Sequence, residues 1–145
     1  MVDGDDRTDA ERSDAESTSD YGDFPLRRFL GMELTGDDPG VGFATLDVGA
    51  EHLNPNGVVH GAVLFALVDT AMGKSTMSVI DESGVYCASI DVSLRFIRPA
   101  LSGTLTATAT VVKRGRHVAH LEARVSDSDD RLVATAAATF AILGG

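Results

Sequence analysis

The sequence predicts an α+β fold in which a curved antiparallel sheet wraps around one long buried helix. The stretch from residue 60 to about 77 is apolar in every direction of a helical wheel, which is typical of a helix buried on all sides. Two short strand-like segments precede this stretch, and about four segments of alternating apolar and polar residues follow it. About six strands offer enough surface to bury one such helix.

Before the long helix, apolar residues at 24, 26, 29 and 30 predict a short helix over 24–30, which Gly31 ends. Residues 32–34 and 42–48 predict a first hairpin, because residues 36–40 between them are rich in glycine, aspartate and proline. The polar stretch 51–58 contains a proline and a glycine and predicts a loop.

After the helix, apolar and polar residues alternate, and this period of two residues is typical of β-strands. Residues 89–96 predict a strand whose Ile90, Val92 and Leu94 cover the helix. Further strands are predicted over 104–112, 117–125 and 132–142, with turns at 113–116 and 126–130.

The length and composition allow one folded domain. A chain of 145 residues with 43% apolar side chains can build a single core but not two complete domains. The longest apolar run, 62–68, has seven residues, whereas a membrane span needs about twenty. The single cysteine, Cys87, excludes an internal disulfide framework, and we expect it to fill the core or an interface.

The first 23 residues differ from the rest of the chain. They hold nine acidic residues and two arginines, and they lack both apolar periodicity and the apolar segment of a secretory signal. We expect residues 1–23 to form a disordered acidic tail and residues 24–145 to form the domain. Without a signal or a membrane span, a cytoplasmic location is expected.

Acidic residues dominate the whole chain, and the net charge of -10 disfavours binding to nucleic acids and to anionic membranes. The chain has ten arginines but two lysines, and sixteen aspartates but six glutamates. Strongly hydrated carboxylates in place of flexible lysines are typical of proteins in concentrated salt, so we expect a halophilic protein. The alternative is an ordinary domain that carries an acidic tail.

One residue contradicts the apolar character of the long helix. Asp69 lies between Val68 and Thr70, where a carboxylate is costly unless it is neutralised, paired or placed at a wet site. Such a group usually has a function, although it could also be a structural acid bonded to helix or loop donors.

The loop before the helix brings an amide side chain, Asn54, and an imidazole, His60, to the helix N-terminus. There, free N–H groups and the helix dipole favour a developing anion. Together with the N–H of Gly61, which has no side chain, these groups are suited to an oxyanion site. His60 could also simply cap the helix.

These residues resemble the hotdog-fold acyl-CoA thioesterases of the phenylacetate-pathway (PaaI) type. The resemblance covers about residues 24–142 and rests on HLNPNGVVHG at 52–61, LVDTA at 67–71, SIDVS at 89–93 and RPALSG at 98–103. The spacing Asn-x5-His-Gly-x7-Asp is its most specific element. Ala62 replaces a second glycine of many relatives but leaves Gly61 in place.

The resemblance implies a hotdog fold and the hydrolysis of an acyl-CoA thioester without a cofactor. It implies that Asp69 acts as general base or nucleophile, that the Gly61 N–H polarises the thioester carbonyl and that Asn54 orients the thioester or the water. His60 would help to hold the loop, and Ser89 or a neighbour would position the attacking water. Whether Ser89 reaches the site stays open, because its strand face is the polar one.

Gly61 and Asp69 are eight residues apart, which is about 12 Å along a helix. One helix cannot place both residues on one carbonyl, so a shared thioester requires a second copy of the chain. The resemblance also implies a homodimer with antiparallel helices and two shared sites, and a homotetramer is compatible with it.

The phosphates of CoA need cations, and Arg98, Arg114 and Arg116 are the candidates, although any turn collects charge. His117 and His120 are three residues apart and would lie on opposite faces of a strand, so no metal site is expected.

Two other functions stay open. A non-catalytic hotdog sensor that binds acyl-CoA would not need a buried base, and an enoyl-CoA hydratase is disfavoured because no histidine lies within or just after the helix. The expected acyl group is aromatic or of medium length. Phe65, Met72, Met77 and Phe96 could line its pocket or be plain core.

Overall fold

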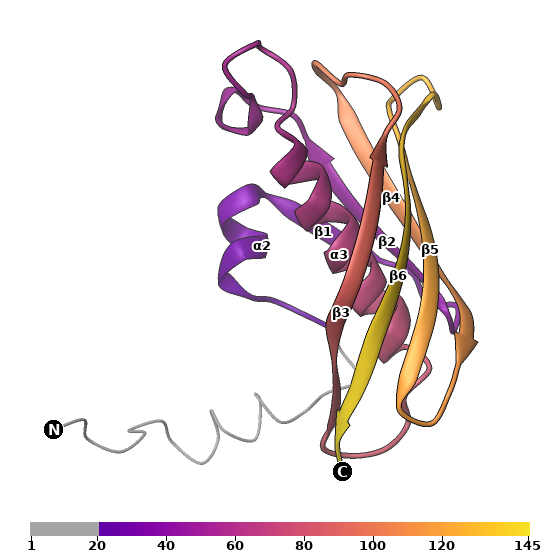
Figure 1. Cartoon of the computed structure of the whole chain (residues 1–145). Helices are drawn as coiled ribbons and strands as arrows, with labels where there is room; N and C mark the ends of the chain where they lie inside the picture. Colours follow the sequence, from indigo (N-terminus) through magenta and orange to yellow (C-terminus); the bar gives the residue numbers. More distant parts are fainter. Residues whose placement is uncertain (1–20) are drawn as a thin grey trace, which may run out of the picture.

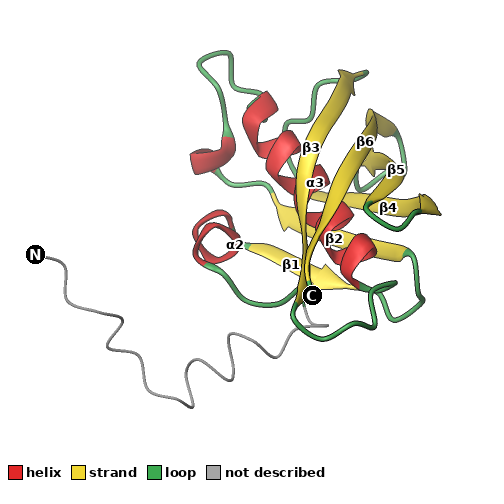
Figure 2. Cartoon of the chain, turned by 60° about the horizontal axis from the view of Figure 1, so that its bottom comes forward, coloured by secondary structure: helices red, strands yellow, loops and turns green. Residues whose placement is uncertain are grey.

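The computed structural model describes residues 21–145, so most of the predicted tail, residues 1–20, lies outside the described residues. One main helix, α3 (Gly61–Met77), lies against a six-stranded antiparallel sheet with the order β1-β2-β4-β5-β6-β3 (Figure 1). The strands are β1 (Met32–Thr35), β2 (Val41–Asp47), β3 (Val85–Phe96), β4 (Thr104–Arg114), β5 (Val118–Ser126) and β6 (Leu132–Gly144). The sheet curls around α3, so that β3 and β6 cross the direction of β1 and β2 (Figure 2). The predicted fold class is confirmed.

In the described part of the chain, two short helical elements precede α3. The predicted short helix is α2 (Pro25–Leu30), and it ends at Gly31, whose φ of 76° lies in the left-handed region that favours glycine. A 3-10 turn, η1 (Ala50–His52), lies in the loop between β2 and α3. Within residues 21–145, no helix is long and apolar enough to cross a membrane.

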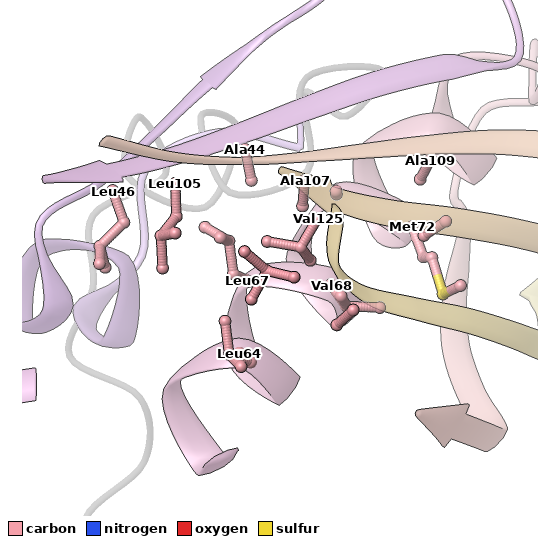
Figure 3. Close-up of a cluster of buried hydrophobic side chains, with 14 of the residues drawn as sticks. Ala44, Leu46, Leu64, Leu67, Val68, Met72, Leu105, Ala107, Ala109 and Val125 are labelled. Carbon is pink, nitrogen blue, oxygen red and sulfur yellow. The ribbon is translucent and has the colours of Figure 1, made fainter. Parts of the chain in front are cut away.

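The core lies between α3 and the sheet. Large helix side chains face small residues on the strands, so that the helix can lie close to the sheet (Figure 3). The residues that meet there are Leu64, Leu67, Val68 and Met72 from α3 and Ala44, Ala107, Ala109 and Val125 from the sheet. Each large side chain that is fully buried stabilises the fold by about 1.5–3 kcal/mol.

One face of α3 stays open in the single chain. Ala62 and Phe65 are exposed, and Ala66 and Asp69 are partly exposed. The spacing of three and four residues places all four on one side of the helix. We call these four residues the open stripe. The expectation that α3 is buried on all sides therefore holds only for the side of the helix that faces the sheet.

β3 is an edge strand that begins four residues before the predicted start. Ser89 pairs with Phe140 while Asp91 pairs with Thr139, so Ile90 is the extra residue of a β-bulge. The bulge reverses the alternation of the strand. The prediction that Ile90 covers the helix is wrong, since this side chain is 61% exposed.

The predicted turn at 113–116 is too long, because Lys113 and Arg114 still belong to β4. At the other end of the domain, packing begins before the predicted boundary at residue 24. The ring of Tyr21 already lies against α3 at Gly73.

Candidate active site

The start of α3 leaves one backbone donor open. Nδ1 of His60 accepts a hydrogen bond from the Ala62 N–H (2.9 Å). The His60 carbonyl accepts from the N–H groups of Val63 (2.9 Å) and Leu64 (3.4 Å). Of the first four N–H groups, only that of Gly61 has no partner within the described part of the chain. It can therefore bind an anion or a polarised carbonyl oxygen.

A cleft of about 430 Å³ opens at this donor. Its walls come from the loop before α3, the first turn of α3, the last residue of β3 and the segment 97–100 that follows. A Cβ on Gly61 would lie 3.0 Å from Cζ of Phe96, so the missing side chain lets the aromatic ring approach the donor. Arg98 lines the same cleft and supplies a cation there.

Asn54 organises the loop that forms one wall of the cleft. Its Oδ1 accepts hydrogen bonds from the N–H groups of Asn56 (2.9 Å) and Val58 (3.3 Å). Its Nδ2 forms no hydrogen bond within residues 21–145, so both amide hydrogens remain for a ligand in the cleft. His60, by contrast, uses Nδ1 to cap the helix, which was one of the two expected roles.

His52 is a buried histidine that the sequence interpretation did not single out. Its Nδ1 accepts a hydrogen bond from the Gly49 N–H (2.9 Å), and its Nε2 donates to the Leu30 carbonyl (2.8 Å). Its own carbonyl accepts from the His60 N–H (2.8 Å). His52 thereby connects α2, the loop and the start of α3. The available signal was its place as the first residue of the motif at 52–61.

Asp69 lies on the open stripe, two turns beyond Gly61. Burial raises the pKa of its carboxyl, and a hydrogen bond with the Ser89 side chain partly opposes this shift. Oδ1 is buried and has no hydrogen-bond partner within the described residues. A carboxylate with a raised pKa and an unpaired oxygen is well suited to accept a proton near neutral pH.

The bulge in β3 explains how Ser89 reaches Asp69. Because Ile90 is the extra residue, Ser89 shares the helix-facing side with its partner Phe140, while Asp91 faces away. Cys87, two residues earlier, also faces α3, and its Sγ lies 3.9 Å from the Gly73 carbonyl. Burial, followed by the charge of Asp69, raises the pKa of Cys87 to about 11, so its thiol is protonated and unreactive.

Ser89→Ala is expected to move the acidic limb of the pH–rate profile to higher pH. The Ser89 bond lowers the pKa of Asp69, so its loss raises that pKa further, and a base is active only when it is ionised. We also expect kcat to fall about tenfold at neutral pH, which corresponds to the loss of one hydrogen bond of about 1.4 kcal/mol. Ser93→Ala is the matched control, because Ser93 is on the outer side of the same strand. An unchanged acidic limb in Ser89→Ala would contradict this role.

The structure does not bring every candidate residue together. Asp69 is not among the residues that line the cleft at Gly61, as the helical separation requires. Arg114 and Arg116 lie at the opposite end of the sheet, near the end of α3, where Arg114 forms an ion pair with Glu82 (2.8 Å).

Of the candidate pocket residues, Met72 and Met77 are buried core side chains, whereas Phe65 and Phe96 are exposed. Within residues 21–145, no group of three or more His, Cys, Asp or Glu side chains could hold a metal ion.

Comparison with known proteins agrees with this geometry. The family model of the thioesterase superfamily matches residues 56–134, more than half of the chain. The chain belongs to the thioesterase superfamily. The matched residues of this thioesterase include all of α3, with both Gly61 and Asp69, and the bulged strand β3.

Individual relatives support the assignment. The thioesterase is similar to the structure of PaaI from the phenylacetic acid degradation operon of E. coli, with 26% identity, a TM-score of 0.77 and coverage of 93% of this chain and 91% of that one. Human acyl-coenzyme A thioesterase 13 is 34% identical over 97 residues, which are 65% of this chain and 67% of the human one. A Haemophilus influenzae thioesterase shares the fold, with a TM-score of 0.78, 23% identity and coverage of 99% and 96%.

These findings confirm the resemblance. The protein is a hotdog-fold thioesterase of the PaaI type, and thus a thioester hydrolase.

Proposed function

We propose that this thioesterase hydrolyses an acyl-CoA with an aromatic or medium-chain acyl group to the free acid and CoA. One observation carries the proposal: α3 presents a single open N–H at Gly61 and a carboxylate of raised pKa at Asp69. Thioester hydrolysis needs these two groups, one for the developing oxyanion and one for the proton of water. The similarity to human acyl-coenzyme A thioesterase 13 supports CoA as the thiol.

In this mechanism the thioester carbonyl oxygen accepts a hydrogen bond from the Gly61 N–H, and Asn54 orients the thioester through its free amide donors. Ser89 positions a water molecule, and Asp69 takes a proton from it as general base. The water oxygen bonds to the carbonyl carbon, and the carbon–sulfur bond then breaks. The CoA sulfur leaves with the proton that Asp69 returns. Water is the only other reactant, so no cofactor is required.

The two catalytic groups act on one thioester if two protomers share each site. Two uncovered surfaces support a homodimer: the open stripe of α3, where Phe65 is 43% exposed, and the free edge of β3, where Ile90 is exposed. Antiparallel pairing of the two helices would place Asp69 of each protomer opposite Gly61 of the other. A two-fold axis then creates two equal sites.

The same arrangement gives the arginines a role. Arg98 lines the cleft at Gly61, where it would bind a CoA phosphate. Arg114 and Arg116 lie at the far end of their own protomer, but antiparallel helices bring this end towards the cleft of the other protomer. We therefore propose that they bind phosphates of a CoA held mainly by the other copy.

A thiol-release assay over a panel of acyl-CoAs tests the proposed function. The assay is run at low and at high salt, because the Asp-rich, Lys-poor composition leads us to propose halophilic activity. We expect CoA release from aromatic or medium-chain substrates. Binding of an acyl-CoA without any release of CoA would instead support the sensor function.

Complementation tests the shared site. Asp69→Ala and Gly61→Pro chains are each expected to be inactive alone. In a random mixture about half of the dimers contain one chain of each kind, and each of these has one intact site, so activity should return to about a quarter of the wild-type value. Two different affinity tags, one on each variant, isolate the mixed assemblies, and size-exclusion chromatography separates dimers from tetramers. Confirmed mixed dimers without activity would contradict shared sites.

A further inference from the structure

Tyr21 lies just before α2, yet its ring packs against α3 beside the proposed base. A Cβ on Gly73 would lie 2.5 Å from Cζ of Tyr21, so the ring occupies the space that a side chain at this position would fill. Gly73 is four residues after Asp69 and therefore on the same side of the helix. Tyr21 thus covers the helix one turn beyond Asp69.

The ring is held in place by apolar contacts. It packs edge-on against Phe24, with 5.7 Å between the ring centroids. It also packs against the small apolar cluster of Met77, Ile80 and Val85 at the end of α3. These contacts come from α3, the loop after it and β3, so the position of Tyr21 is fixed by three parts of the domain.

The electrostatic surroundings place the phenol close to the proposed site. Burial, followed by the negative charge of Asp69, raises the pKa of Tyr21 to about 12. The phenol is therefore neutral at physiological pH, and Asp69 is near enough for its charge to act on it. A neutral ring can border an acyl group without adding a charge to its surroundings.

The open stripe ends at this ring. All four residues of the open stripe are at least partly exposed, whereas Gly73 is buried under Tyr21. In the proposed mechanism the carbonyl carbon is attacked next to Asp69, so the acyl group must begin there. An acyl group that extends along α3 from Asp69 towards Gly73 meets the ring after about 6 Å, the distance of one helical turn.

Resting on the proposed function, we propose that Tyr21 forms a wall of the acyl-binding space and restricts the enzyme to acyl groups that end before Gly73. The chemical class that fits is a compact acyl group, either a short to medium aliphatic chain or a single aromatic ring. Tyr21 is then a specificity-determining residue that comes from outside the motifs typical of the family.

The test compares kcat/KM over straight-chain acyl-CoAs of increasing length for the wild type and Tyr21→Ala. Each additional methylene that leaves water is worth about fourfold, so Tyr21→Ala should raise kcat/KM for a chain two carbons beyond the wild-type optimum about 16-fold relative to the optimum substrate. Tyr21→Phe keeps the ring and should keep the wild-type length profile. Phe29→Ala removes an aromatic ring that is 82% exposed on α2 and controls for general effects.

Tyr21→Leu keeps an apolar side chain over Gly73 and replaces Tyr21→Ala in the test if that variant does not fold. It should shift the chain-length profile of kcat/KM in the same direction by a smaller factor. A folded Tyr21→Ala or Tyr21→Leu with an unchanged length profile would overturn the inference and leave the proposed function intact. A profile that shifts equally in Tyr21→Phe would also overturn it, since the hydroxyl and not the wall would then set specificity. A wild type that hydrolyses no acyl-CoA would overturn the proposed function itself.

Discussion

Asp69→Asn is expected to lower kcat about 10²–10⁴-fold, the range in which a positioned general base contributes to catalysis. Asparagine has nearly the shape of aspartate, but its amide cannot accept the proton of the attacking water. KM should change little, because asparagine keeps the size and shape of the side chain beside the thioester and only the proton acceptor is lost. Thiol release with the best substrate of the panel measures both constants. Full activity of the variant would show that another group is the base.

The same variant should be at least as stable as the wild type. Since burial raises the pKa of Asp69, the folded protein keeps this proton to a higher pH than the unfolded chain. The free energy of unfolding therefore falls as the pH rises from the ordinary pKa of 3.8 through the raised value. Asparagine removes this loss, so Tm at pH 7 should rise, by about 2–4 °C for each 1 kcal/mol that is regained at about this chain length. The difference should shrink as the pH is lowered, and a lower Tm for the variant at pH 7 would contradict it.

Gly61→Pro is expected to lower kcat about 10²–10³-fold, the usual cost of losing one oxyanion donor. Proline has no N–H, so the substitution removes the open donor itself. The fold should tolerate it, because proline is favoured at the first position of a helix. The preceding residue, His60, has φ -63° and ψ 138°, an extended conformation that is preferred before proline.

Gly61→Ala is the matched control for this substitution. Alanine adds the same Cβ near the ring of Phe96 but keeps the N–H. We therefore expect Gly61→Ala to retain most of its kcat, with a change mainly in KM as the ring of Phe96 moves. Circular dichroism and Tm check that both variants are folded. Equal losses of kcat in the two variants would mean that crowding, and not the donor, explains the effect.

The residues that could be placed from the sequence are those whose position in the fold depends on local spacing. The apolar stretch with one carboxylate was sufficient to locate α3 and to single out Asp69. The motif before the helix located Asn54, His60 and Gly61, because the donors of a helix N-terminus occupy fixed positions relative to its first residue. The separation of Gly61 and Asp69 along α3 likewise follows from helical geometry alone.

The remaining features depend on contacts between distant segments. Ile90 fits an uninterrupted alternation in the sequence, so the bulge that turns Ser89 towards the helix becomes visible only in the pairing of β3 with β6. Tyr21 stands next to a strongly acidic segment without periodicity, and nothing nearby in the sequence connects it with Gly73. The open stripe of α3 could not be predicted either, because the sequence does not show whether an apolar side chain is covered by its own chain or by another molecule.

The bulge at Ile90 also affects which strands can extend the sheet. β3 is a 12-residue strand at the free edge, and a straight edge of this length would accept almost any extended peptide and favour open-ended aggregation. A bulge twists the edge and interrupts the regular row of donors and acceptors. Only a strand that complements this irregularity can add along its full length. The distortion that orients one serine thus also protects the protein against indiscriminate strand addition.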